Sequence, residues 1–152
     1  MTGIVVRTRR QTAAGRLYPR YDQESGILAV ESRVERPWAF GVDIDGTVVF
    51  DLDGCLVLAN FDFHVPKTRW ERSLLEDECP AIAPSADLLF AAETVQRKSF
   101  HLPIRARTDR EARRLRIEFG LVDPDRAVSL SDNCLALLAK SELVGFSLRG
   151  LR

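Results

Sequence analysis

The sequence predicts a mainly β protein, of the β-rich α+β class, whose antiparallel hairpins and meanders form two packed layers. Between residues 21 and 64, short apolar runs are interrupted by Ser-Gly or Asp-Gly pairs, which are typical of tight hairpin turns. Residues 99–107 and 114–119 alternate apolar with polar side chains, as strands with one buried face do. The 152 residues are 45% hydrophobic and 29% charged, so a domain with its own core is expected.

The first predicted meander reverses at Asp45-Gly46 and again at Asp53-Gly54. A three-residue first loop, with glycine in the left-handed conformation, and a two-residue second turn place apolar residues opposite one another. Val42 then faces Val48, and Phe50 faces Val57. The apolar side of this sheet would consist of Trp38, Phe40, Val42, Val48, Phe50, Leu52, Cys55, Val57 and Ala59.

The opposite side of the same meander is mixed, and Val49, Leu56 and Leu58 form an apolar group on it. A monomeric sheet would leave this group in water, so another part of the chain or a second subunit is expected to cover it. The three residues are therefore a candidate dimer face.

Residues 65–86 are expected to form a connector that contains one short helix near residues 67–76. Pro66 can open a helix, and Trp70 and Leu74 recur at helical spacing before the prolines that follow.

The chain is expected to be a single domain, 1–152, which could consist of two related β subunits. These subunits would cover about residues 17–64 and 87–152, on either side of the connector. At an offset of 87 residues, Asp45-Gly46 falls on Asp132-Asn133. A duplication and a chance repetition of hairpin spacing both remain open.

Composition excludes several classes of protein. No stretch approaches the roughly 20 apolar residues of a membrane helix, and no leader-like apolar run follows the N-terminal arginines. A cytoplasmic protein with no membrane association is therefore expected. Cys55, Cys79 and Cys134 are far apart and odd in number, which argues against a disulfide framework or a zinc site. Neither a cofactor nor a metal is expected.

The net charge of zero hides an uneven distribution. Residues 1–20 carry five arginines and no acid, residues 21–94 carry 15 acids against 5 bases, and residues 95–152 carry 12 bases against 7 acids. This asymmetry indicates either a partner surface or charge complementarity within the domain.

Arginines concentrate in the predicted hairpin formed by residues 99–107 and 114–119. Arg105, Arg107, Arg114 and Arg116 would lie on the face opposite the apolar residues, as a site for an anionic group or a protein partner. The alternative is a solvated sheet face that pairs with the acidic middle of the chain. Nucleic acid is not favoured, because Phe100 and Phe119 lie on the apolar face and cannot stack on bases.

The segment VDIDGTVV, residues 42–49, resembles the first motif of the haloacid dehalogenase-like phosphatases. That resemblance implies a metal-dependent hydrolase in which Asp43 is the nucleophile and Asp45 the acid/base. The motif requires a parallel strand before it and a helix after it, whereas a second D-x-D-G at hairpin spacing favours a turn. The decisive observation is whether residues 38–44 pair antiparallel with residues 47–52.

The segment YDQESGILAV, residues 21–30, resembles the opening hairpin of a small bacterial family of unknown function, Y-D-x-E-x-D-x-L-Y-I. The second hairpin of that family, D-x-D-x-x-G-x-L-V-G-I-E-I, is similar to DLDGCLVLANFDF (51–63) and to KSELVGFSL (140–148). The resemblance implies no activity. The expected function is a non-enzymatic interaction or accessory module that binds a protein or an anionic partner, with homodimerisation expected and the phosphatase-like hydrolase as the alternative.

Overall fold

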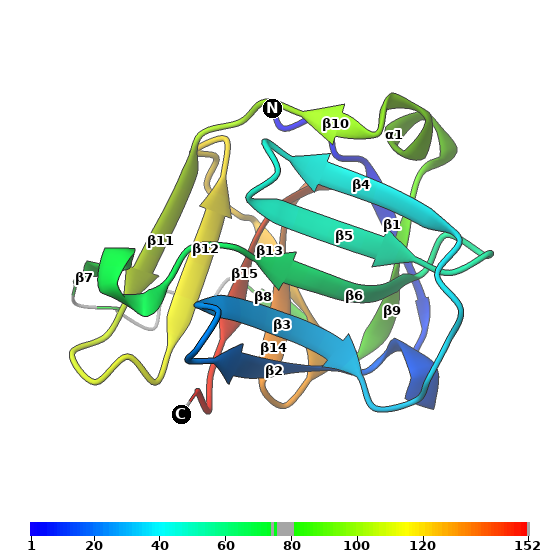
Figure 1. The fold of residues 1–152 in the computed structure, drawn as a ribbon. Coiled ribbons are helices and arrows are strands. Elements are labelled where there is room, and N and C mark those ends of the chain that lie inside the picture. Colours follow the sequence, from blue (N-terminus) through cyan, green and yellow to red (C-terminus); the bar gives the residue numbers. More distant parts are fainter. Residues whose placement is uncertain (74, 76–80, 152) are drawn as a thin grey trace.

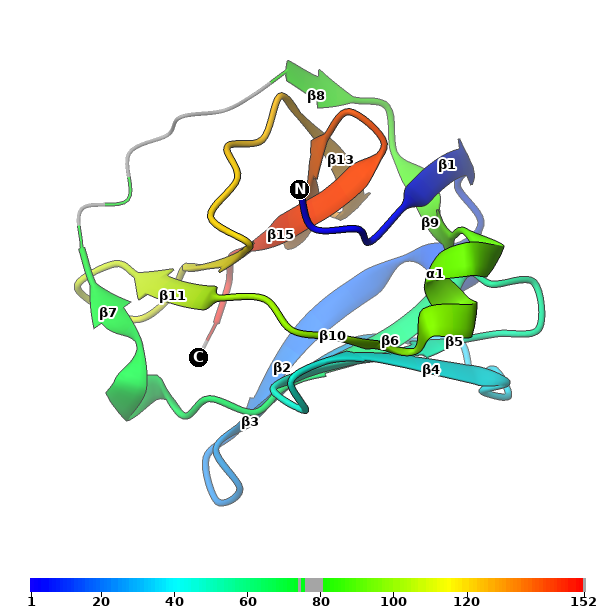
Figure 2. The same cartoon turned by 90° about the horizontal axis from the view of Figure 1, so that it is seen from above.

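The computed structural model of the protein describes residues 1–73, 75 and 81–151. Within them, the prediction of a mainly β fold of two packed layers with one short α-helix is confirmed. Figure 1 shows one sheet in front of the other, and Figure 2, turned by 90°, shows the two sheets one above the other. No helix among the described residues is long and apolar enough to cross a membrane.

The first sheet has the strand order β10-β4-β5-β6-β3-β2. Its strands pair antiparallel, except that β10 pairs parallel with β4. The strands are β2 (Leu17–Asp22), β3 (Ile27–Ser32), β4 (Phe40–Ile44), β5 (Val48–Leu52), β6 (Leu58–Phe63) and β10 (Ser99–Phe100).

The second sheet has the strand order β7-β11-β12-β15-β14-β13-β8. The short edge strands β7 and β8 pair parallel with their neighbours, and the other pairs are antiparallel. The strands are β7 (Glu71–Arg72), β8 (Ala81–Ala83), β11 (Ile104–Thr108), β12 (Leu115–Phe119), β13 (Arg126–Ser131), β14 (Cys134–Ala139) and β15 (Glu142–Leu148).

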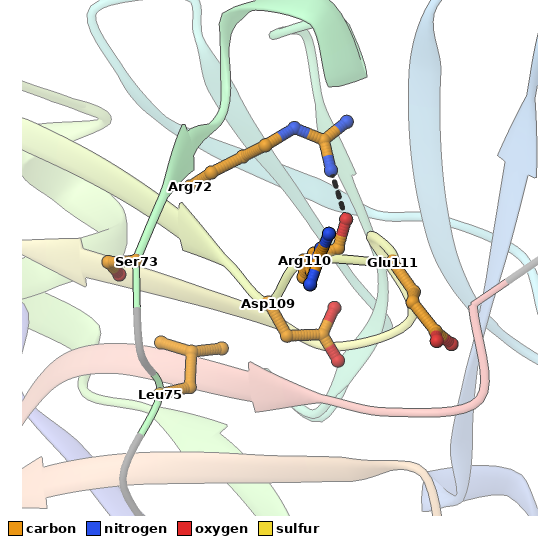
Figure 3. Close-up of a pocket in the computed structure, with 6 residues that line it drawn as sticks. All are labelled: Arg72, Ser73, Leu75, Asp109, Arg110 and Glu111. Carbon is orange, nitrogen blue, oxygen red and sulfur yellow. Dashed lines mark hydrogen bonds between the residues drawn. The ribbon is translucent and has the colours of Figure 1, made fainter.

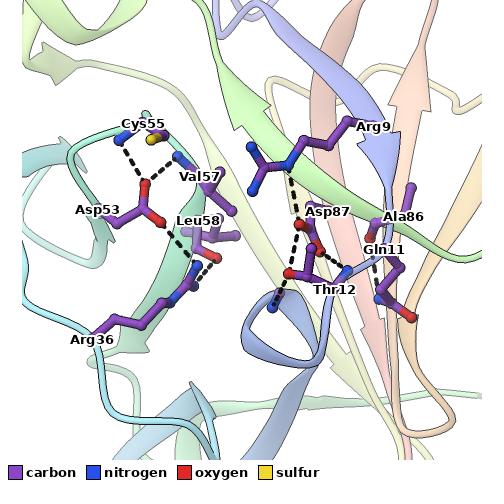
Figure 4. A network of polar contacts seen from close by, with 11 residues as sticks. Arg9, Gln11, Thr12, Arg36, Asp53, Cys55, Val57, Leu58, Ala86 and Asp87 are labelled. Atoms are coloured by element: carbon purple, nitrogen blue, oxygen red, sulfur yellow. Dashed lines mark hydrogen bonds and ion pairs between the residues drawn. The ribbon is translucent and has the colours of Figure 1, made fainter.

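The N-terminal strand β1 (Val6–Arg10) pairs antiparallel with β9 (Ala86–Phe90) and closes one side of the sandwich. The Asp87 carboxylate of β9 is fully buried and accepts hydrogen bonds from Arg9 Nε (3.2 Å), Thr12 Oγ1 (2.9 Å) and the Thr12 backbone N–H (3.0 Å) (Figure 4). Thr12 also caps the 3₁₀ turn Ala13–Gly15. A buried carboxylate requires such partners, so this network attaches the N-terminal segment firmly to β9.

The position of the helix differs from the prediction. Pro66 is followed by a single 3₁₀ turn, Lys67–Arg69, and then by β7, while residues 74 and 76 of the expected helix lie outside the described residues. The α-helix of the structure is instead α1 (Ala92–Arg97), between β9 and β10. The predicted connector is also part of the second sheet, because its strands β7 and β8 form the two edges of that sheet.

The two sheets share one strand order, because β2-β3-β4-β5-β6 of the first sheet correspond to β11-β12-β13-β14-β15 of the second. In both sheets a β-bulge interrupts the register at the corresponding place, between Asp51 and Leu52 in β5 and between Leu137 and Leu138 in β14. Matching the registers makes Phe61 equivalent to Phe146. The two sheets thus repeat one strand order, while the duplication of one unit stays a prediction.

The core lies between the two sheets and is rich in phenylalanine. Fully buried rings come from both sheets and from β9: Phe50, Phe61, Phe63, Phe90, Phe100, Phe119 and Phe146. In β5 and β12 buried and partly exposed residues alternate, as the predicted period of two requires.

The predicted apolar face is correct in the middle of the first sheet, but the register differs. Val42 faces Phe50 rather than Val48, because Asp45, Gly46 and Thr47 form the loop. Asp45 and Gly46 have φ angles of 52° and 67°. A shift of two residues keeps every side chain of β4 and β5 on its predicted face, so the core pattern of these two strands survives the error.

The second turn of the meander is longer than predicted. The loop covers residues 53–57 instead of two residues, and Leu56 adopts a φ of 66°. Phe50 therefore faces Phe61, not Val57. Among the residues expected on the apolar face, Trp38 and Phe40 are exposed at the end of the sheet, and Cys55 is exposed in the loop.

Candidate partner-binding surface

The turn aspartates attach β10 to the edge of β4. Asp43 accepts hydrogen bonds from Gly46 N (2.8 Å) and from Ser99 Oγ (2.7 Å). Asp45 accepts one from Leu102 N (3.2 Å) and contacts His101 Nδ1, while its own N–H donates to Phe100 O (3.0 Å). These contacts give both carboxylates a structural role.

The geometry that the phosphatase alternative requires does not occur. Residues 40–44 pair antiparallel with residues 48–52, so the chain reverses into β5 after Gly46 instead of entering a helix. Across the described part of the chain, no group of three or more His, Cys, Asp or Glu side chains could hold a metal ion. Nothing in the fold therefore favours nucleophilic chemistry at Asp43.

The outer face of β11 and β12 brings the predicted arginines together. Arg107 lies directly opposite Arg116 in the ladder, and Arg105 lies opposite Glu118. Arg114 immediately precedes β12. The predicted hairpin is thus present, and its basic side chains share one face.

Two carboxylates partly neutralise this arginine face, which we define as Arg105, Arg107, Arg114 and Arg116. Arg105 makes two hydrogen bonds to Glu71 of β7 (3.0 and 2.8 Å), which hold the pKa of Glu71 below its ordinary value. Arg107 Nε lies 2.6 Å from Glu118 Oε1, and Arg116 Nε lies 3.8 Å from the same oxygen. Among the described residues, Arg105, Arg107 and Arg116 therefore share two carboxylates.

Arg116 is the least satisfied member of the arginine face. Its side chain is only 16% exposed, and its Nε is buried without a hydrogen-bond partner among the described residues. A buried donor without a partner costs about 1–3 kcal/mol. An incoming oxygen ligand could reduce that cost if the guanidinium turned toward it.

A hollow of about 520 Å³ lies at the tip of the hairpin, and its described lining contains none of the four arginines of the face. Figure 3 shows Arg72, Ser73 and Leu75 on one side of it and residues 109–111 on the other. Arg72 Nη1 donates to the Arg110 carbonyl across it. Sequence reasoning missed this place, because Arg72 was assigned to a helix of the connector.

The candidate dimer residues do not share one exposed face. Leu58 is 1% exposed and belongs to the core, and Leu56 packs against that core from the loop before β6. Val49 is partly exposed on the outer side of β5. Homodimerisation stays a prediction, but these three side chains do not form a surface for it.

No protein-family model matches the chain, and no curated protein matches it. The likeness of residues 21–30 and 51–63 to the small bacterial family of unknown function therefore stays a prediction.

Proposed function

We propose that this protein is a non-enzymatic interaction module that binds an acidic segment of a partner protein on its arginine face. Free thiols at Cys55 and Cys134 suit a reducing compartment, so the proposal places the module in the cytoplasm.

The observation that carries the proposal is the direct opposition of Arg107 and Arg116 in the β11–β12 ladder. Like charges at opposed positions destabilise a sheet, and among the described residues Glu118 is the carboxylate that forms ion pairs with both. Carboxylates of a partner would supply further counter-charge. Arginine binds them in a planar, bidentate geometry, which gives strength and orientation together.

A protein partner fits this face better than a nucleic acid does. The aromatic rings of the neighbouring strands, Phe100 and Phe119, are fully buried between the sheets. Single-stranded nucleic acids usually stack their bases on exposed aromatic rings. Stacking on these two rings would require the core to open.

The test measures the binding of a fluorescein-labelled deca-glutamate peptide by fluorescence anisotropy. The double variant Arg107→Gln/Arg116→Gln should bind at least ~10-fold more weakly than the unaltered protein, since charged hydrogen bonds contribute about 1.5–3 kcal/mol each. The matched control, Arg7→Gln/Arg10→Gln, removes the same charge from exposed residues of β1 and should bind normally.

A third variant, Glu118→Gln, distinguishes the proposal from general loss of structure. It removes the carboxylate that competes for Arg107 and Arg116, so it should bind the peptide more tightly. Equal binding by all four proteins, or tighter binding of a single-stranded RNA oligonucleotide than of the peptide, would overturn the proposal.

A further inference from the structure

A second hollow, of about 650 Å³, lies on the first sheet, far in the sequence from the arginine face. Residues 33–39 cross from β3 to β4 and form its rim, while Glu31 of β3 and Ala59 and Asn60 of β6 form its floor. Trp38 stands on the rim with 63% of its surface exposed.

The corresponding place on the second sheet is filled. There Ala127, Leu137 and Val144 form a small buried cluster, and Val122 from the equivalent crossing segment packs on it. The equivalent positions of the first sheet, by register, are Gly41, Asp51 and Ala59. Of these three residues, Ala59 lines the hollow, so the first half has an alanine beside an open hollow where the second half has Val144 in a buried apolar cluster.

The rim of the hollow is held in place before any ligand arrives. Arg36 donates from Nη1 to Asp53 Oδ2 (3.0 Å) and from Nη2 to the Leu58 carbonyl (2.9 Å), as Figure 4 shows. Its side chain is 10% exposed, and its Nε is buried with no partner in the described residues. Arg36 therefore fixes the crossing segment. A fixed wall lowers the entropic cost of binding.

The chemistry of the lining selects the class of ligand. The ionic side chains balance, with Glu31 and Glu35 against Arg33 and Arg36, so neither an anion nor a cation is favoured. The floor strands β3 and β6 are paired on both sides, so no free backbone edge can add a peptide strand. Recognition is then left to the side chains of the lining, which offer an exposed indole, a hydroxyl, carboxylates and guanidinium groups.

We propose that this hollow binds a pyranose unit of a neutral oligosaccharide. The apolar face of a sugar ring would pack on Trp38, whose indole combines a large apolar surface with a polar N–H. The carboxylates of Glu31 and Glu35 and the guanidinium group of Arg33, which line the hollow, would exchange hydrogen bonds with its hydroxyls. The volume lies within the range of small-molecule sites, about 300–1,000 Å³.

The test uses isothermal titration calorimetry with cellohexaose, maltohexaose and xylohexaose, and with a mixture of neutral hexapeptides. At least one oligosaccharide should bind at millimolar concentration or better, and Trp38→Ala should abolish that binding. Iodide quenching gives a second readout. Trp38 should be protected from iodide by the sugar, while Trp70, which is 4% exposed, contributes little quenching.

The decisive variant introduces into the hollow the apolar side chain that stands at the equivalent position of the second sheet. Ala59→Val introduces the residue that stands at the equivalent position, Val144, and should abolish binding. The control Ala29→Val makes the same change on the outer face of β3, outside the hollow, and should leave binding intact. Absence of binding by all three oligosaccharides overturns the inference. So does binding that Trp38→Ala leaves unchanged, or preferential binding of the peptides. Because Arg107 and Arg116 take no part, failure here does not affect the proposed function.

Discussion

Phe61 and Phe146 stack on each other across the interface between the two sheets, with ring centroids 4.1 Å apart and planes inclined by 25°. Phe61 belongs to β6 and Phe146 to the equivalent strand β15, so the contact joins corresponding positions of two sheets with the same strand order. The stacked rings therefore couple the packing of one sheet to that of the other.

Substitution of either ring should destabilise the whole sandwich and not one layer alone. Phe61→Leu and Phe146→Leu should each lower the free energy of unfolding by roughly 1–2 kcal/mol, because both rings are fully buried. Urea denaturation followed by circular dichroism measures both effects. In a double-mutant cycle the pair should show a coupling of about 0.5–1.5 kcal/mol. Additive effects, or separate transitions for the two sheets, would contradict this account. Phe40→Leu, at a ring that is 44% exposed, is the control.

The sequence predicted the layers of the fold because alternation alone decides which side chains are buried. Val42, Phe50 and Phe119 lie in the core as the period of two requires. Alternation does not distinguish registers that differ by two residues, so it could not predict that Val42 pairs with Phe50 instead of Val48. The loop length after Asp53 depended on the positive φ of Leu56, a residue type that rarely adopts it.

The sequence alone predicted the arginine face, but it did not predict the carboxylates that partly neutralise it. Arg107 and Arg116 share a face because their strands alternate in phase. Glu71, which pairs with Arg105, comes from a segment that was expected to be helical. The sequence did not predict the hollow beside Trp38. The hollow is recognised by comparing Ala59 with its equivalent Val144, and the two residues are known to be equivalent only from the strand registers.

Gly15 should tolerate no side chain. A Cβ at this position would lie 1.6 Å from Asp87 Oδ1, inside the buried network that holds the N-terminal segment. Gly15→Ala should therefore destabilise the protein by about 2–4 kcal/mol, since it separates a buried carboxylate from its partners. Thermal unfolding measures the effect. Gly54→Ala, where no atom lies within 4 Å of the new Cβ, should change stability by less than ~0.5 kcal/mol. A similar loss for both variants would contradict this explanation.

The ionised carboxylate of Asp51 should lower the free energy of unfolding at neutral pH. Partial burial raises the pKa of its carboxyl, as does the nearby charge of Asp62, while the hydrogen bond from Asn60 lowers it. A raised pKa means that the native state binds the proton more tightly than the unfolded chain does. The stabilisation from the neutral form is complete below the unfolded pKa of about 3.9 and is lost as the pH rises through the folded pKa.

Asp51→Asn should therefore raise the melting temperature at pH 7, and the difference from the unaltered protein should shrink at pH 3. Thermal unfolding across this pH range measures both changes. Asp123→Asn, at an exposed carboxyl, is the control and should show neither. A gain for Asp51→Asn that is the same at both pH values would show that charge burial is not its cause.

Cys134 should be chemically inert in the folded protein, whereas Cys55 should react. Cys55 is exposed and Cys134 is buried, and burial raises the pKa of the Cys134 thiol well above its ordinary value. Because Cys79 lies outside the described residues, the measurement uses a Cys79→Ser background. There, Ellman's reagent should titrate one thiol in the native state and two in urea.

The same raised pKa makes stability depend on pH on the alkaline side. The buried thiol stays protonated in the native state, while the unfolded thiol ionises above about pH 8.5, so stability is complete below that pH and falls above it. One such group contributes a slope of about 1.4 kcal/mol per pH unit. Cys134→Ala should lose stability at pH 7 through the cavity that it creates, and should then decline less steeply than its parent between pH 9 and 10. Parallel declines of the two proteins, measured by urea denaturation, would show that the Cys134 thiol ionises equally in the folded and unfolded states.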